Sequence, residues 1–238
     1  MIRTSGRLYC FSPPAMLATF LIEIGLAIYI LVRYKMTTLV RLASAILISL
    51  AVFQLAEFNV CGTASSTAMF WSRIGYISIA LLPPLALHLI LTIAKRKTHL
   101  LQVMAYATSL LFVFTFGLSS KAFEGHVCAG NYAIFQLVHP VGGIFFAYYY
   151  AWISVGIGLS LYFSIKADQR VREALILQVV GYLSFILPTG IVNAINPNTI
   201  VGIPSVMCGF AVIYAVILAV GIVPISLDEH FLIRAKRS

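Results

Sequence analysis

Seven long apolar runs, separated by short polar segments, occupy most of this chain. A helix needs roughly 20 apolar residues to cross the hydrocarbon core of a bilayer, and most of the runs are near that length. No long polar stretch divides them into two groups, so we predict one membrane domain over residues 1–238, folded as an all-α, polytopic seven-transmembrane helix bundle. The expected spans are residues 14–33, 40–59, 70–94, 100–118, 142–165, 174–194 and 201–222.

The composition supports a membrane location. Hydrophobic residues make up 61% of the chain and charged residues only 10%, whereas soluble domains carry about 25% charged residues. The first apolar run is longer than the core of a signal peptide, about 7–15 residues, and no small-x-small cleavage site follows it. We therefore expect it to remain as the first span.

The basic residues predict the orientation of the bundle. The net charge is +9, but these residues cluster in short segments between apolar runs, which argues against nucleic-acid binding. With the N-terminus outside, twelve of the 16 Lys and Arg fall on the inner side, among them Lys95, Arg96 and Lys97. Since basic loops stay cytoplasmic, we predict an outer N-terminus and a cytoplasmic C-terminus.

Three charged residues fall within or at the ends of spans, where charge is expensive. Glu23 lies midway along the first span and suggests a proton site, a ligand contact or a hydrogen bond to a neighbouring helix. Glu57 ends the second span and Arg73 begins the third. An ion pair between them would pin the two helices, or it would form the polar floor of an outward-facing pocket.

The third span has the most distinctive sequence. It opens near Trp71, at the interface where Trp is enriched, and carries Pro83 and Pro84 at its middle. Prolines remove backbone donors and bend helices. His88 follows one turn later. We expect it to bond a neighbouring helix rather than haem, since His139 would differ from it in depth by roughly 20 Å.

The remaining motifs exclude several chemistries. The last two spans lack the lysine that retinal needs, and we find no phosphate loop, His-Glu-x-x-His motif or catalytic nucleophile. We therefore expect no enzyme activity, no cofactor and no metal. On the outer side, Cys61 and Cys128 predict a disulfide in an oxidising compartment, with free thiols as the alternative.

Two apolar segments leave alternatives open. Residues 132–138, before the fifth span, are expected to lie along the interface or to lengthen that span outward. Within the fifth span, aromatic residues would line an apolar ligand pocket or only pack against neighbouring helices. These residues are Tyr148, Tyr149, Tyr150 and Trp152.

The second and third spans resemble a known sensor family. The relevant segments are Leu-Ala-Glu at 55–57, Phe-Trp-Ser-Arg-Ile-Gly-Tyr at 70–76, Pro-Pro at 83–84 and His-Leu at 88–89. They are similar to the seven-transmembrane N-terminal sensor region of bacterial membrane histidine kinases. The resemblance implies a sensor in the bacterial cytoplasmic (inner) membrane. Members of that family carry a PAS, kinase or cyclase domain after span seven, whereas this chain stops at Ser238.

These observations give three functional hypotheses. The first is a receptor-like module that senses a small or lipidic ligand and signals in trans, with Pro83 and Pro84 as the moving kink. Its ligand-binding residues would be Glu23, Glu57, Trp71, Arg73 and Tyr76. The second is a structural accessory subunit of a larger membrane complex, and the third a small transporter or proton carrier using Glu23. The expected partners are membrane lipids and a membrane protein that contacts the cytoplasmic loops or the lipid-facing helices.

Overall fold

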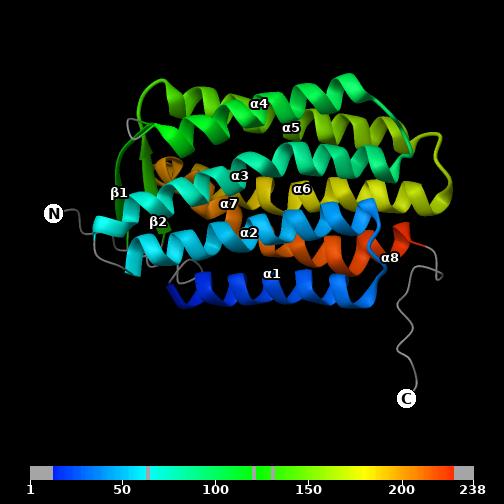
Figure 1. Cartoon of the computed structure of the whole chain (residues 1–238), viewed down its shortest axis with the longest axis horizontal. Helices are drawn as coiled ribbons and strands as arrows, with labels where there is room; N and C mark the ends of the chain where they lie inside the picture. The colour runs from blue at the N-terminus through cyan, green and yellow to red at the C-terminus, as the bar shows by residue number, and fades with distance from the viewer. Residues whose placement is uncertain (1–12, 63–64, 120–121, 130–131, 228–238) are drawn as a thin grey trace, which may run out of the picture.

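Seven long helices run side by side along the longest axis of the molecule (Figure 1). The computed structural model describes residues 13–62, 65–119, 122–129 and 132–227. Within this part, seven helices are long and apolar enough to cross a membrane, which confirms the predicted fold. Six of them are α1 (Pro13–Arg33), α2 (Thr38–Gly62), α3 (Ser65–Ile93), α4 (His99–Leu118), α5 (Val141–Ser164) and α6 (Gln169–Ile195). The seventh begins with α7 (Ile203–Val216) and continues to Ser226.

The seventh span is longer than α7 itself. A π-helical segment, η4 (Ile217–Ile222), follows α7 directly and leads into the short helix α8 (Val223–Ser226). At the other end, the 3-10 helix η3 (Pro197–Gly202) joins α6 to α7. Short π-helical segments inside longer helices are often found at functional sites.

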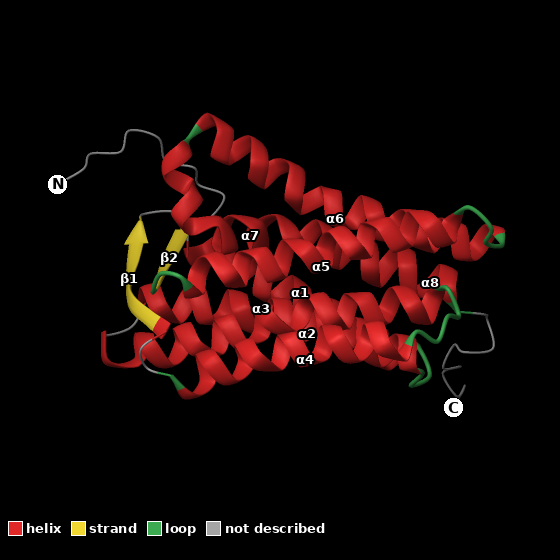
Figure 2. Ribbon diagram, turned by 90° about the horizontal axis from the view of Figure 1, so that it is seen from above, coloured by secondary structure: helices red, strands yellow, loops and turns green. Residues whose placement is uncertain are grey.

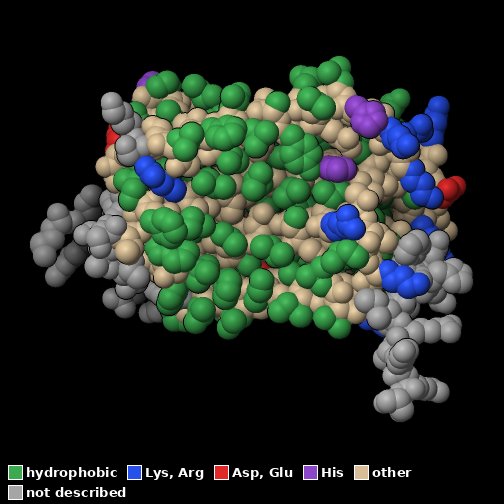
Figure 3. All heavy atoms as spheres, viewed as in Figure 1, with side chains coloured by type: hydrophobic (Ala, Val, Ile, Leu, Met, Phe, Trp, Pro, Cys, Tyr) green, Lys and Arg blue, Asp and Glu red, His purple; other side chains and the backbone are tan. Residues whose placement is uncertain are grey.

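The two ends of the bundle differ in chemistry. We call the end with the α1–α2, α3–α4 and α5–α6 connections the basic end, since the described Lys and Arg other than Arg73 lie at or near it. Many of the Lys and Arg side chains visible in Figure 3 lie toward that end, while hydrophobic side chains cover the middle. We call the opposite end, with the α2–α3 connection, the hairpin end.

A β-hairpin at the hairpin end corrects one expectation. Strands β1 (Phe123–Ala129) and β2 (Tyr132–Leu137) pair in antiparallel fashion, so residues 132–137 do not lengthen α5, which was one of the two alternatives (Figure 2). The ring of Phe123 lies 5.5 Å from that of Tyr76 and 5.6 Å from that of Phe116. These aromatic contacts fix the hairpin to α3 and α4.

Two helices begin five residues earlier than the apolar runs predict. Helix α3 starts at Ser65 rather than at residue 70, and α6 starts at Gln169 rather than at residue 174. Both added segments contain polar residues, because a helix can continue beyond the hydrocarbon core into the polar interface. The expected ten-residue connection between the second and third spans thereby shrinks to residues 63–64, which lie outside the described part.

Helices α2 and α3 form the centre of the bundle. In each of these two helices, 72% of the residues in an apolar stretch of 18 are buried inside the bundle. The corresponding share is 22% for α1 and 17% for α4. Gly75 permits close packing here: a Cβ built on it would lie 3.2 Å from the Cβ of Ala56. The face of α3 that carries Gly75 therefore packs directly against α2.

Candidate functional site

The two prolines of α3 lie where three helices are tied together. The helix continues through Pro83 and Pro84. Pro84 has no N–H, so the carbonyl of Ala80, four residues earlier, loses its intrahelical donor. The hydroxyl of Ser109 in α4 donates to this oxygen at 2.8 Å, and the hydroxyl of Tyr148 in α5 donates at 2.7 Å. Neighbouring helices thus satisfy the carbonyl that Pro84 frees.

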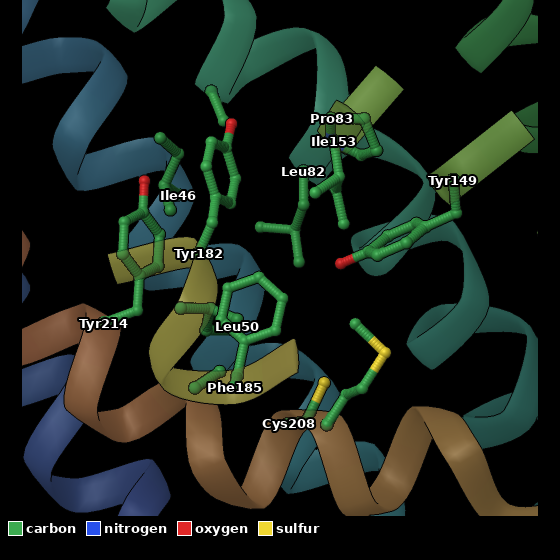
Figure 4. Close-up of a pocket in the computed structure, with 13 residues that line it drawn as sticks. Ile46, Leu50, Leu82, Pro83, Tyr149, Ile153, Tyr182, Phe185, Cys208 and Tyr214 are labelled. Atoms are coloured by element: carbon green, nitrogen blue, oxygen red, sulfur yellow. The ribbon is translucent and has the colours of Figure 1, made fainter. Parts of the chain in front are cut away.

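A small apolar cavity lies against the other side of this proline turn (Figure 4). Its volume is about 30 Å³, and five helices enclose it. In Figure 4 the hydroxyl of Tyr149 points toward the centre, near Leu82 and Phe185. Its lining residues are Ile46 and Leu50 of α2, Leu82, Pro83 and Ala86 of α3, Tyr149 and Ile153 of α5, Tyr182 and Phe185 of α6, and Met207, Cys208, Ala211 and Tyr214 of α7.

A second apolar cavity extends this one toward the hairpin end. Its volume is about 20 Å³, and it shares Tyr149, Met207 and Cys208 with the first cavity. Each cavity has room for about one or two water-sized groups. Because their walls are almost wholly apolar, they are suited to hydrocarbon rather than to polar ligands.

The α6 and α7 walls of the cavity are locked to one another. The rings of Tyr182 and Tyr214 stack with centroids 6.0 Å apart, and Gln178 donates to the hydroxyl of Tyr214 at 2.8 Å. A Cβ built on Gly181 would lie only 2.4 Å from Cδ2 of Tyr214. Glycine at position 181 is therefore required for the ring of Tyr214 to lie where it does.

The predicted acidic residues lie together, outside these cavities. Glu23 and Glu57 are 0% and 1% exposed, and their carboxyl groups are close enough to interact electrostatically. Tyr76 of α3 and Cys208 of α7 also interact electrostatically with Glu57. The structure therefore brings three of the five predicted ligand-binding residues, Glu23, Glu57 and Tyr76, into one region between α1, α2, α3 and α7.

Trp71 and Arg73 are not part of that region. In the described part of the chain no ion pair joins Arg73 to Glu57, and the Nε atom of Arg73 is buried without a hydrogen-bond partner. Trp71 is partly buried and packs edge-on against Phe70, with centroids 5.6 Å apart. Instead of pairing with Arg73, Glu57 interacts with Glu23 of α1, Tyr76 of α3 and Ser205 and Cys208 of α7.

Two further polar side chains, His88 of the third span and Trp152 of the fifth, bond to α4. Nδ1 of His88 lies 3.1 Å from the hydroxyl of Tyr106 in α4, which confirms the expected interhelical bond. Trp152 donates to Thr108 at 3.1 Å. Of the fifth-span aromatic residues, Tyr148 and Trp152 therefore link helices, whereas Tyr149 lines the cavity.

The predicted disulfide is not tested. Cys61 belongs to α2 and Cys128 to β1, but their side chains lie outside the described part of the structure. The pairing stays a prediction. Cys208, by contrast, is a free thiol and is buried.

The fold and these sites define a multi-pass helical membrane protein. The family model of the N-terminal seven-transmembrane region of histidine kinases matches residues 15–227, and the chain belongs to this family. The protein is thus a membrane sensory module. No curated protein and no solved structure matches the chain.

Most of the cavity was not predicted from the sequence. Of the lining residues, the sequence points only to Pro83, as part of the proline kink, and to Tyr149, as a residue of a ligand pocket or of the packing between helices. The residues from α6 and α7 look like ordinary apolar span residues, and only the packing of five helices brings them together. Gly181 and Gln178, polar or small residues amid an apolar run, are the signals that could have drawn attention to α6.

Proposed function

We propose that this protein is a non-catalytic, receptor-like module that senses a small apolar or lipidic molecule in its central cavity. The observation that carries the proposal is an apolar cavity bounded at once by the proline turn of α3 and by α7, beside the π-helical segment η4. The wall is aromatic and aliphatic, so hydrocarbon would be its natural ligand.

The size of the cavity determines how a ligand would act. A volume of about 30 Å³ holds little more than a methyl group, so a larger molecule must bind an arrangement in which the helices lie farther apart. Ligand would therefore shift the population between two arrangements in proportion to its preference for the open one. The proline turn is suited to this movement, because its freed carbonyl depends on side chains rather than on the helix.

The signal would leave along the seventh span. Met207, Cys208, Ala211 and Tyr214 line the cavity from α7, and η4 continues α7 to the basic end. We place the partner there, on the cytoplasmic face of the bacterial inner membrane. Supporting this, two grooves of about 300 and 620 Å³ lie at the basic end, with Lys95, Arg170, Asp168 and Glu173 among their walls.

Photolabelling in lipid nanodiscs tests the ligand site. A fatty acid with a diazirine group would be activated by light, and labelled positions mapped by mass spectrometry. We expect labelling of Tyr149 and Met207 in the wild-type protein. Ala211→Val and Ala86→Val each add two methyl groups to the wall, so each should reduce that labelling several-fold.

Two further variants separate filling from general damage. Leu82→Ala enlarges the cavity and should increase labelling, although it destabilises the fold by about 2–5 kcal/mol. Leu111→Val changes a lipid-facing residue of α4, 67% exposed, and should leave cavity labelling unchanged. Equal labelling of the wild type and both filled variants would contradict the proposal.

A further inference from the structure

A second group of buried polar side chains lies next to the cavity without lining it. Glu23 of α1 and Glu57 of α2 are almost fully buried, and so are Gln54 of α2 and Ser205 of α7, each 2% exposed. Gln54 and Glu57 are three residues apart and therefore share a face of α2. Ser205 lies near enough to Glu57 for a weak hydrogen-bonding interaction. We call these four residues the carboxyl cluster.

The carboxyl cluster has unused bonding capacity. Both side-chain oxygens of Glu23 and the Oε1 atom of Glu57 are buried without a hydrogen-bond partner. The Nε2 atom of Gln54 and the hydroxyl of Ser205 are also buried without a well-formed bond. Buried polar atoms are almost always bonded, so several orphaned atoms in one place need an explanation.

Among the residues that the structure describes, no basic group interacts with the two carboxyl groups. The titratable groups that interact with them are Tyr76 from α3 and Cys208 from α7, together with each other. None of these is basic. Two adjacent carboxylates with no compensating charge are not stable inside an apolar bundle, where even one ionised group costs several kcal/mol.

The chemistry of the cluster defines what would relieve this imbalance. The carboxyl groups of Glu23 and Glu57 and the hydroxyl of Ser205 are hard oxygen donors from three helices, α1, α2 and α7, and the amide nitrogen of Gln54 lies on the same face of α2 as Glu57. We propose that the carboxyl cluster of Glu23, Gln54, Glu57 and Ser205 binds one small monovalent cation, a proton or a sodium ion. Both ions supply the same chemistry, a single positive charge held between oxygen atoms.

The position of the cluster suggests that a cation would reach it from the hairpin end. Glu57 lies within two turns of the end of α2 at the hairpin end, whereas Glu23 lies midway along α1. The cluster therefore extends from near the hairpin surface toward the middle of the bundle. Cys208 interacts electrostatically with both carboxyl groups and also lines the cavity, so α7 carries both sites, although the cation site does not depend on a ligand in the cavity.

Thermal unfolding of the full chain in detergent tests the proposal in two arms. One arm varies sodium at fixed pH, replaced by N-methylglucamine to hold ionic strength constant. The other varies pH at fixed sodium. A ligand that binds only the folded state stabilises that state. If sodium or the proton is the bound ion, raising its concentration to ten times its Kd should therefore raise the unfolding midpoint of the wild type by roughly 3–6 °C.

Three variants assign that response to the cluster. Glu23→Gln and Glu57→Gln keep shape and burial but remove one negative charge each, and both should weaken the response. Glu173→Gln changes an exposed carboxylate in the second turn of α6 and should keep the response. The readout is the response to the ion, so an altered absolute stability of a variant does not confuse the result, and either cluster variant suffices if the other fails to fold.

Infrared spectroscopy distinguishes the two ions. A bound proton gives the carbonyl band of a protonated carboxyl group, which should weaken in Glu23→Gln and in Glu57→Gln. Bound sodium instead shifts the carboxylate bands when sodium is added. A wild-type protein that responds in neither arm, or cluster variants that respond as the wild type does, would overturn the cation site and leave the photolabelling test of the cavity untouched.

Discussion

At the scale of single residues, the carbonyl oxygen of Ala80 is the point on which the middle of the bundle depends. It is the oxygen that Pro84 deprives of its helical donor, and it accepts from both Ser109 and Tyr148. Either hydroxyl alone keeps the oxygen bonded. Losing both leaves a buried backbone acceptor without a partner, which is much worse than losing one bond.

We therefore predict that Ser109→Ala and Tyr148→Phe are strongly non-additive. Each single change should lower the free energy of unfolding by about 0.5–1 kcal/mol, as is typical of hydrogen bonds between membrane helices. The double variant should lose about 3 kcal/mol, since the orphaned carbonyl adds its own penalty. Equilibrium unfolding in mixed detergent micelles measures all four proteins of the cycle.

Pro84→Ala provides the matched control for this cycle. Alanine at position 84 restores an N–H that can donate to Ala80 within the helix. In that background the double change should cost little more than the sum of the single changes. An additive cycle in the wild-type background would show that the proline-freed carbonyl does not hold the three helices together.

The sequence predicts part of this arrangement. Pro83 and Pro84 are recognisable as a break in the bonding of the third span, and any such break requires donors from elsewhere. Which donors reach it depends on helix rotation, at about 100° per residue, and apolar spans do not specify that angle. The same uncertainty explains why Glu57 and Arg73 were expected to pair, although Oε1 of Glu57 and Nε of Arg73 are each buried without a hydrogen-bond partner.

At the scale of secondary-structure elements, length and hydropathy predict the helices well but miss the hairpin. The residues of β2 form a mostly apolar run without strict alternation, which does not distinguish a strand from a helix. The overlooked signal is the dipeptide Gly130-Asn131 between two short runs, a typical hairpin sequence. Helix ends were misplaced for another reason, because hydropathy detects the hydrocarbon core and not the polar turns beyond it.

Packing between α6 and α7 gives a prediction at this scale. Gly181→Ala should destabilise the protein by about 1–3 kcal/mol, because its Cβ would overlap the ring of Tyr214, which must move with its bond to Gln178. Gly190→Ala is the control on the same helix, since a Cβ there meets nothing within 4 Å. Thermal unfolding should show a lower midpoint only for Gly181→Ala, and equal midpoints would argue against close α6–α7 contact.

At the scale of the whole molecule, the two ends of the bundle present different surfaces to the two sides of a membrane. An odd number of spans places the start of α1 and the end of α8 at opposite ends (Figure 1). The basic end carries Lys95, Arg96 and Lys97, while the hairpin end carries the folded β1–β2 connection. If a partner receives the signal at the basic end, that end must face the cytoplasm.

Cysteine labelling in intact cells tests this orientation. In a variant with Cys10, Cys61, Cys128 and Cys208 replaced by serine, single cysteines would be introduced at Lys97 in the α3–α4 connection or at Asn198 in η3. Because basic loops are retained in the cytoplasm, a membrane-impermeant maleimide should label the Asn198→Cys protein and not the Lys97→Cys protein. After the cells are opened, both should be labelled, which shows that each thiol is reactive. The reverse pattern in intact cells would place the basic end outside and would exclude a cytoplasmic partner at that end.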